Sequence, residues 1–290
     1  AIQNHWGTAP GILMTVEIPH RTTGAPHRCT LAAMPGVPAE MKPMFEQMVV
    51  PHLPSSGMAL HRRVLRTFGY GESDAEHLLG DLTARGRNPE VGITASEAVI
   101  SLYVSARGET LEACHAMAEQ VCQEIHLKLG RAVFAEGDID LHHVVARDLT
   151  SAGRSICCME GSSTGGLIAQ WLSDEPNADA VLRESRVYGN ALQGQPAPPP
   201  GDGWSEWALT QCQNLRHSSG ADFVILTSSA HDETNADSLL IRRGMVAVGG
   251  DGLFELRDVS MTGNVAIFRQ RAARTALNLV RLALPETGRK

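Results

Sequence analysis

An apolar run that breaks into small hydroxyl and glycine residues constrains the fold of this chain more than any other segment. Residues 156–160 are mostly apolar, residues 161–166 read Gly-Ser-Ser-Thr-Gly-Gly, and helical spacing resumes at Leu167. This order predicts a strand, a tight loop and a helix. Free backbone N–H groups and the positive end of the helix dipole would converge at the loop, which suits an anion or an oxyanion. A structural alternative remains open, in which Ser162 or Ser163 caps the helix and the glycines permit the turn.

The composition is that of an ordinary globular protein without a general affinity for polyanions. The 290 residues are 43% hydrophobic and 20% charged, which is enough for two or three domains. The low aromatic content favours packed α/β layers over an aromatic-rich β-sandwich. A net charge of −7 argues against binding to nucleic acid or to an anionic membrane. The cysteines lack CxxC spacing, which indicates reduced thiols and a cytoplasmic location, and no apolar run approaches the roughly 18 residues of a membrane span.

Residues 1–61 are expected to form the end of an α/β unit. They read as a loop at 4–11, a strand at 12–18, a returning strand at 29–34 and a helix at 39–53. The loops rich in Gly and Pro would lie at the ends of neighbouring strands, where α/β folds bind ligands, although Gly and Pro also punctuate ordinary turns. Because the chain begins with Ala1 in a loop, we expect further sequence upstream.

Residues 62–150 are expected to form a small α+β domain. The elements follow the order strand, helix, strand, strand, helix, which gives an antiparallel sheet with helices on one face. Ser73, with Glu76 three residues later, is typical of a capping box on the first helix. The adjacent His142 and His143 have no second ligand cluster at metal spacing, so the sequence indicates no metal site.

Residues 151–290 are expected to form a second α/β unit. Beyond the opening strand, loop and helix, the pattern predicts strands at 221–227, 239–248 and 252–258 and helices at 204–217 and 268–284. The fold class that follows is α/β, with three-layer α/β units joined by the small α+β domain.

Three sets of motifs make the chain resemble the CinA family of competence/damage-inducible proteins. The first set is Gly7-Thr8-Ala9-Pro10-Gly11 together with Met34-Pro35-Gly36-Val37-Pro38-Ala39-Glu40. The second set is Leu65-Arg66-Thr67-Phe68-Gly69 together with Asn88-Pro89-Glu90-Val91-Gly92-Ile93. The third is the Ser162-Ser163-Thr164-Gly165-Gly166 loop.

For residues 1–61, the resemblance implies the end of a molybdopterin-binding-like domain. In the family this domain is associated with a metal-dependent ADP-ribose pyrophosphatase activity. The loops of its nucleotide-like ligand pocket correspond here to Gly7, Thr8, Ala9, Pro10, Gly11, Pro35, Gly36 and Pro38. The family's acidic catalytic residues and divalent metal ligands would lie upstream of Ala1.

For residues 62–150, the resemblance implies a KH-like module. RNA binding by such a module needs a GxxG loop between helices and a basic surface, and the sequence indicates neither. We therefore expect this domain to act as a spacer in a homodimer, with a small-molecule nucleotide as ligand of the protein and with neither nucleic acid nor membrane as partner.

For residues 151–290, the resemblance implies a domain related to the nicotinamide mononucleotide (NMN) deamidases, which release ammonia from the carboxamide of NMN without a cofactor. The family motif Ala-Glu-Ser-Cys-Thr-Gly-Gly corresponds to residues 160–166, so Ser162 takes the nucleophile position and Ser163 replaces the cysteine. The substrate-binding positions would be Ser163, Thr164, Gly165, Gly166, Tyr188, Asn190 and Thr227.

The motifs depart from the family at three places. Gln193 stands where the family has the lysine that activates the serine, and an amide cannot act as that base. Residues 227–232 lack the glycines of the family's Thr-Gly-Ile-Ala-Gly-Pro motif, and residues 263–265 lack the arginine of its Gly-Asp-Arg motif, a candidate phosphate ligand. We therefore expect lost or altered deamidase activity. Two alternatives stay open: an active amidase with His231 as a substitute base, and a non-catalytic nucleotide-binding or dimer-assembly protein.

Overall fold

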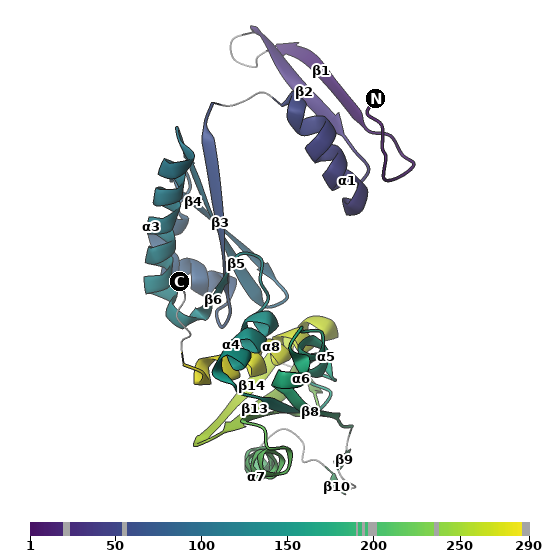
Figure 1. The fold of residues 1–290 in the computed structure, drawn as a ribbon, viewed down its shortest axis with the longest axis vertical. Helices are drawn as coiled ribbons and strands as arrows, with labels where there is room; N and C mark the ends of the chain where they lie inside the picture. Colours follow the sequence, from purple (N-terminus) through teal and green to yellow (C-terminus); the bar gives the residue numbers. More distant parts are fainter. Residues whose placement is uncertain are drawn as a thin grey trace. The chain divides into compact units, whose positions relative to one another are not determined.

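The computed structural model describes residues 1–19, 24–53, 57–189, 191–192, 195–196, 202–234 and 238–285. The chain divides into two compact units, Ala1–Met58 and Ala59–Lys290 (Figure 1). The second unit contains both the small α+β domain and the C-terminal α/β domain. The mixed α/β class expected from the sequence is therefore confirmed.

The first unit is built on a β-hairpin and a helical segment. β1 (Ile12–Pro19) pairs antiparallel with β2 (Pro26–Ala33), and α1 (Pro38–Met44) continues as a π-helical turn (Phe45–Val49) and a 3₁₀ turn (Val50–His52). Pro38 lies in the first turn of α1, where its missing N–H leaves no helical hydrogen bond unmade. The strands and the helical segment predicted for this part of the chain are confirmed.

A four-stranded antiparallel sheet forms the middle domain. Its strands lie in the order β4 (Glu90–Ser96), β5 (Val99–Gly108), β3 (Ala59–Thr67) and β6 (Val133–Glu136). The sheet packs with α2 (Glu72–Leu79) and α3 (Leu111–Leu129), and 3₁₀ turns follow these helices at Gly80–Thr83 and Gly130–Ala132. Leu65, Leu102 and Ile125 are fully buried between the layers. The predicted order of elements is confirmed.

The two helices of the middle domain begin in different ways. Thr110 is the N-cap of α3, and its Oγ1 accepts a hydrogen bond from the N–H of Ala113 at 3.1 Å. The capping role predicted for Ser73 is wrong, because α2 already begins at Glu72 with Gly71 as its N-cap and no side-chain cap bond. The acidic Glu72 in the first turn instead complements the helix dipole.

A six-stranded sheet forms the centre of the C-terminal domain. The strand order is β12 (His231–Thr234), β13 (Leu240–Gly250), β11 (Phe223–Thr227), β7 (Ile156–Glu160) and β8 (Leu182–Val187), and β14 (Leu253–Thr262) also pairs with β13. β8, β7 and β11 are parallel, whereas β13 runs antiparallel to β11. The short strands β9 (Ala191–Leu192) and β10 (Gln195–Pro196) pair separately. The carboxyl ends of β8, β7 and β11 therefore meet at one edge.

Helices cover both faces of this sheet (Figure 1). One face carries α4 (Leu141–Ala152), α5 (Leu167–Ser173), α6 (Ala178–Val181) and α8 (Val265–Ala283), and the other carries α7 (Asp202–Ser219). Alternation along β7 explains the two cores, because Cys158 packs on the α8 side and Met159 on the α7 side. The expected domain boundary at residue 150 falls inside α4, whose buried face joins the α8 core.

Arginine side chains connect the middle domain to the C-terminal domain. The Arg274 side chain on α8 is 2% exposed and donates hydrogen bonds to the backbone oxygen of Glu97 at 2.9 Å and to Asp140 at 3.2 Å. Its guanidinium also lies 5.0 Å from the ring centroid of Trp171. Arg131 adds hydrogen bonds to the backbone oxygens at the end of α8, including that of Leu282 at 2.8 Å. This junction accounts for the compactness of the second unit.

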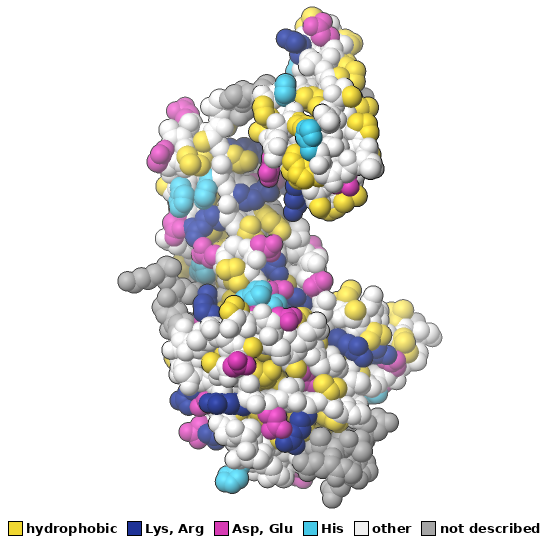
Figure 2. Space-filling model, turned by 45° about the vertical axis from the view of Figure 1, so that its right-hand side comes forward, with side chains coloured by type: hydrophobic (Ala, Val, Ile, Leu, Met, Phe, Trp, Pro, Cys, Tyr) yellow, Lys and Arg dark blue, Asp and Glu magenta, His cyan; other side chains and the backbone are white. Residues whose placement is uncertain are grey.

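Basic and acidic side chains are interspersed on the face drawn in Figure 2. Among the helices of the described ranges, none combines the length and the hydropathy needed to span a bilayer.

Candidate functional site

The predicted loop lies at the carboxyl edge of the parallel strands β8, β7 and β11. Residues 161–166 follow β7, Tyr188 follows β8, and Thr227 is the last residue of β11. This is the edge at which open α/β sheets bind their ligands. The structure thus brings together the loop, Tyr188 and Thr227 from three separate segments of the sequence.

A buried hydrogen-bond network holds the loop from behind. The hydroxyl groups of Thr164 and Thr227 lie 2.8 Å apart, and the N–H of Gly161 donates to Thr227 Oγ1 at 3.1 Å. The hydroxyl of Tyr188 donates to the backbone oxygen of Thr227 at 2.6 Å, and burial raises the pKa of Tyr188 well above its ordinary value. These three side chains are buried, so they support the loop and do not face solvent.

Ser162 and Ser163 have different surroundings. Ser162 is exposed, and its Oγ accepts a hydrogen bond from the N–H of Ala230 at 2.9 Å. Ser163 is fully buried against β13, where a Cβ on Gly244 would lie 2.1 Å from its hydroxyl oxygen. Gly244 is therefore required for this packing, and Ser162 is the serine of the pair that a ligand can reach.

Glu160 is the last residue of β7, and its carboxylate lies at the start of helix α5. Its carboxylate is fully buried and accepts hydrogen bonds from the N–H groups of Gly166 and Ile168, both at 3.1 Å, and of Ala169 at 2.8 Å. A carboxylate at this place compensates both the unpaired N–H groups and the positive end of the helix dipole. The anion that the helix start attracts is thus supplied by the protein itself.

The interpretation in which a serine caps the helix is wrong, and most of the N–H groups expected to bind an oxyanion already have acceptors within the protein. The N–H groups of residues 163, 164, 165 and 167 donate to backbone oxygens of Ser228, Gly161 and Thr164, so they are not free for an oxyanion, whereas the N–H of Ser162 makes no hydrogen bond within the described residues. The N-cap of α5 is Gly166, at φ +92°, and no serine side chain caps the helix. The missed residue is Glu160, which in the sequence reads only as a polar end to an apolar run.

The side chain of Arg269 lies over the loop. A Cβ built on Gly165, at φ +66°, would be 3.3 Å from the guanidinium carbon of Arg269 on α8. Arg269 is exposed and has no hydrogen-bond or ion-pair partner among the residues that the structure describes. The sequence shows the loss of the family's arginine near residue 265 but does not indicate Arg269, because only the packing of α8 brings Arg269 to the loop.

No described side chain is placed to activate Ser162. His231 binds Glu233 through Nε2 at 3.0 Å, and within the described ranges it makes no hydrogen bond to Ser162. Gln193 and Asn190, expected as the replaced base and a substrate-binding residue, lie outside the described residues. The role assigned to these two positions therefore stays a prediction.

The loops expected to line an N-terminal ligand pocket are in contact through Glu40. Asn4 in the first loop donates to the backbone oxygen of Ala9 at 2.9 Å and to the Glu40 carboxylate at 2.7 Å. A Cβ on Gly7 would overlap that carboxylate. Among the described residues of 1–58, no three acidic, His or Cys side chains converge as metal ligands, so we derive no chemistry from the family's metal.

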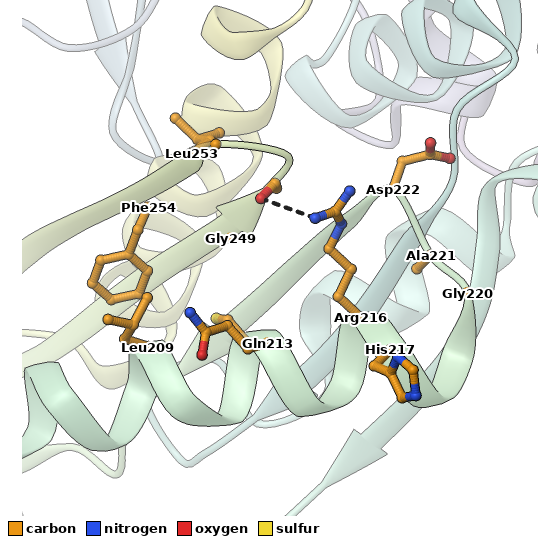
Figure 3. Close-up of a pocket in the computed structure, with 13 residues that line it drawn as sticks. Leu209, Gln213, Arg216, His217, Gly220, Ala221, Asp222, Gly249, Leu253 and Phe254 are labelled. Atoms are coloured by element: carbon orange, nitrogen blue, oxygen red, sulfur yellow. Dashed lines mark hydrogen bonds between the residues drawn. The ribbon is translucent and has the colours of Figure 1, made fainter.

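A cavity lies at the opposite end of β11. It has a volume of about 740 Å³ and is lined by α7, by the start of β11 and by the turn between β13 and β14. Figure 3 shows Arg216 in its wall, with a guanidinium that donates to the backbone oxygen of Gly250 at 3.4 Å. No sequence pattern indicates this cavity, and its lining does not include the Ser162 loop.

The fold defines the class of protein: a KH-like module joined to a three-layer α/β domain with a serine loop at its sheet edge. The family model for the damage-inducible protein CinA KH domain matches residues 62–135. The chain is 38% identical over 194 residues to a CinA-like protein from Dictyoglomus thermophilum, covering 66% of this chain and 44% of that one. It is 35% identical over 215 residues to a CinA-like protein from Dictyoglomus turgidum, covering 73% and 49% respectively.

A solved structure of a competence or damage-inducible protein from Enterobacter asburiae aligns with a TM-score of 0.41 and 17% identity, covering 51% of this chain and all of that one. On the family model and the sequence relatives, the chain belongs to the CinA family. It spans less than half the length of these two relatives.

Proposed function

We propose that the C-terminal domain binds a pyridine nucleotide of the NMN type at the Ser162 loop and has lost fast hydrolysis of the amide. One observation carries the proposal. The N–H groups of the loop from residue 163 to residue 169 all donate within the protein, and no described basic side chain reaches the Ser162 hydroxyl.

Amide hydrolysis by a serine has two requirements that this loop meets poorly, because among the described residues of the loop only the N–H of Ser162 is left without an acceptor. A base must take the proton of the hydroxyl, and preorganised donors must stabilise the oxyanion. Loss of a general base alone slows such a reaction by about 10²- to 10⁴-fold, and loss of an oxyanion donor by about 10²- to 10³-fold. Gln193 in place of the family's lysine is consistent with this expectation.

Arg269 supports the binding part of the proposal. A guanidinium over a glycine turn, with no competing carboxylate among the described residues, is suited to the phosphate of a mononucleotide. The exposed Ser162 hydroxyl lies on the same loop and can accept or donate a hydrogen bond to the ligand. The ligand would thus lie along the loop, with its phosphate toward α8.

We further propose that the protein is a cytoplasmic homodimer in which the KH-like module is a spacer. A pyrophosphatase acting on ADP-ribose would reside in the molybdopterin-binding-like domain and would depend on residues outside this sequence.

Calorimetric titration with NMN tests the binding proposal. We expect saturable binding of NMN and much weaker binding of nicotinamide riboside, which lacks the phosphate. Ammonia measured on the same samples should remain at the level of the buffer. An absence of nucleotide binding would sink the proposal.

Arg269→Ala is expected to weaken NMN binding by about ten-fold, the size of one exposed charge-assisted contact. The effect should shrink as salt is raised, because an exposed ion pair is screened. Arg271→Ala on the same helix is the matched control, since Arg271 is also exposed and does not contact the loop glycines. Equal losses for both variants would exclude a specific phosphate contact at Arg269.

A further inference from the structure

Three potential metal ligands converge on the surface of the C-terminal domain, away from the Ser162 loop. His142 and His143 lie in the first turn of α4, and Glu175 lies in the connection between α5 and α6. One ligand atom from each of the three side chains lies within 4.8 Å of the other two. Within the described ranges, no other group of three such side chains converges in this way.

The cluster is held by its surroundings. Glu175 is fixed by its own backbone, which donates to Leu172 and accepts from the N–H of Ala178 at 3.0 Å. The ring of His142 stacks on Trp171, with centroids 5.1 Å apart and an angle of 17° between the planes. Both imidazoles come from consecutive positions of a regular helix, so the backbone that carries the ligands is rigid.

The negative charge of Glu175 is not neutralised by a Lys or Arg side chain among the described residues. Its side chain is only 10% exposed, and its contacts among the described residues are His143 Nδ1 at 2.5 Å and His142 Nε2 at 3.9 Å, with no Lys or Arg. His142 Nδ1 is buried and has no hydrogen-bond partner in the described part of the chain, so Nε2 is the nitrogen that remains for a ligand. A nearly buried carboxylate between two imidazoles is a favourable environment for a cation.

We propose that His142, His143 and Glu175 bind one divalent transition-metal ion of the Zn²⁺ type, which ties α4 to the α5–α6 connection. Two imidazoles and a carboxylate are a recognised ligand set for Zn²⁺, with ligand distances near 2.0 to 2.2 Å. Those distances place tetrahedral ligand atoms about 3.3 Å apart. The observed separations of 2.5 and 3.9 Å lie on either side of that value, and the exposed ring of His143 can adjust.

The ligand types also favour one class of metal over another. Imidazole nitrogen suits Zn²⁺, Co²⁺ and Ni²⁺, whereas Mg²⁺ and Ca²⁺ prefer ligand sets made of oxygen. The three protein ligands leave a fourth position for water. The inference does not depend on the nucleotide site, because none of the three residues belongs to the Ser162 loop.

The test is calorimetric titration of the tag-free, chelator-treated full chain with Zn²⁺, with Co²⁺ absorption as a second readout of nitrogen and oxygen coordination. We expect saturable binding and a rise in melting temperature with Zn²⁺. Glu175→Gln and His143→Ala should each weaken this site at least about ten-fold, because even changes next to ligands cost that much. His77→Ala, an exposed histidine on α2, should have no effect.

Glu175→Gln preserves the shape of the side chain, so unchanged circular dichroism separates loss of a ligand from loss of the fold. Metal that still binds in the Glu175→Gln and His143→Ala double variant belongs to another site, such as a cysteine or the first unit. The proposal is overturned if Zn²⁺ does not bind, or if it binds equally to wild type and to the double variant. In that case Glu175 and His143 form an ion pair only.

Discussion

Glu160→Ala is expected to destabilise the C-terminal domain by about 3 to 5 kcal/mol, because buried donors left without an acceptor each cost about 1 to 3 kcal/mol. The fully buried carboxylate accepts three N–H groups at the start of α5, and no other described acceptor is bonded to those groups. Removal also deletes the negative charge that the helix dipole favours. The loop that carries Ser162 would then lose the three hydrogen bonds that join it and the start of α5 to Glu160.

Urea unfolding followed by circular dichroism measures this change. Glu160→Gln keeps one carbonyl acceptor and adds an NH₂ group that faces other donors, so its loss should be smaller than that of alanine but still clear. Glu206→Ala, an exposed residue of α7, is the control and should stay within about 0.5 kcal/mol of wild type. A similar small effect at Glu160 would show that the carboxylate does not organise the loop.

Arg274→Ala is expected to cost about 3 kcal/mol, because it breaks the ion pair of a buried arginine and leaves Asp140 with only its longer ion pair with Arg66, at 3.4 Å. Arg274 contacts Glu97 of the middle domain, Asp140 at the start of α4 and Trp171 of α5. Its removal therefore weakens the connection between the domains as well as the local packing. Arg271→Ala, three residues earlier and exposed, should be nearly neutral.

The effect of Arg274→Ala should also depend on pH. Burial alone would raise the pKa of Asp140, but the charge and hydrogen bonds of Arg274 outweigh it, so the pKa lies below its ordinary value. In wild type this carboxylate stabilises the fold above the unfolded pKa, near 3.9, and the contribution is lost as pH falls through the lower folded pKa. Without Arg274, burial favours the protonated acid. The difference in unfolding free energy between wild type and Arg274→Ala should therefore shrink as pH falls from neutral to below about pH 4. A difference that is independent of pH would argue against this pairing.

Local patterns were sufficient to predict most of the fold. The apolar run at 221–227 became β11, and the helical spacing of 268–284 became α8 within a few residues. The start of α2 was misplaced because two capping residues, Gly71 and Ser73, compete locally and both are compatible with a helix start. The packing of α4 on α8 was not predictable from local patterns, since the two helices are more than 100 residues apart in the sequence.

The candidate site was predicted in position but not in its internal contacts. The run ending at Glu160 and the small residues after it indicated a strand, a loop and a helix, and these are confirmed. The N–H groups that donate to the Glu160 carboxylate depend on the three-dimensional path of the loop, which the sequence does not show. Arg269 and Glu175 likewise reach their neighbours only through the packing of separate helices.

The rate of ammonia release from NMN, compared between wild type and Ser162→Ala, tests the central claim most directly. We expect the two rates to be indistinguishable, while NMN still binds to wild type. The reason is that the Ser162 hydroxyl accepts from the N–H of Ala230 and has no described base. Robust turnover by wild type that is lost in Ser162→Ala would contradict the account and would indicate an active amidase with a substitute base.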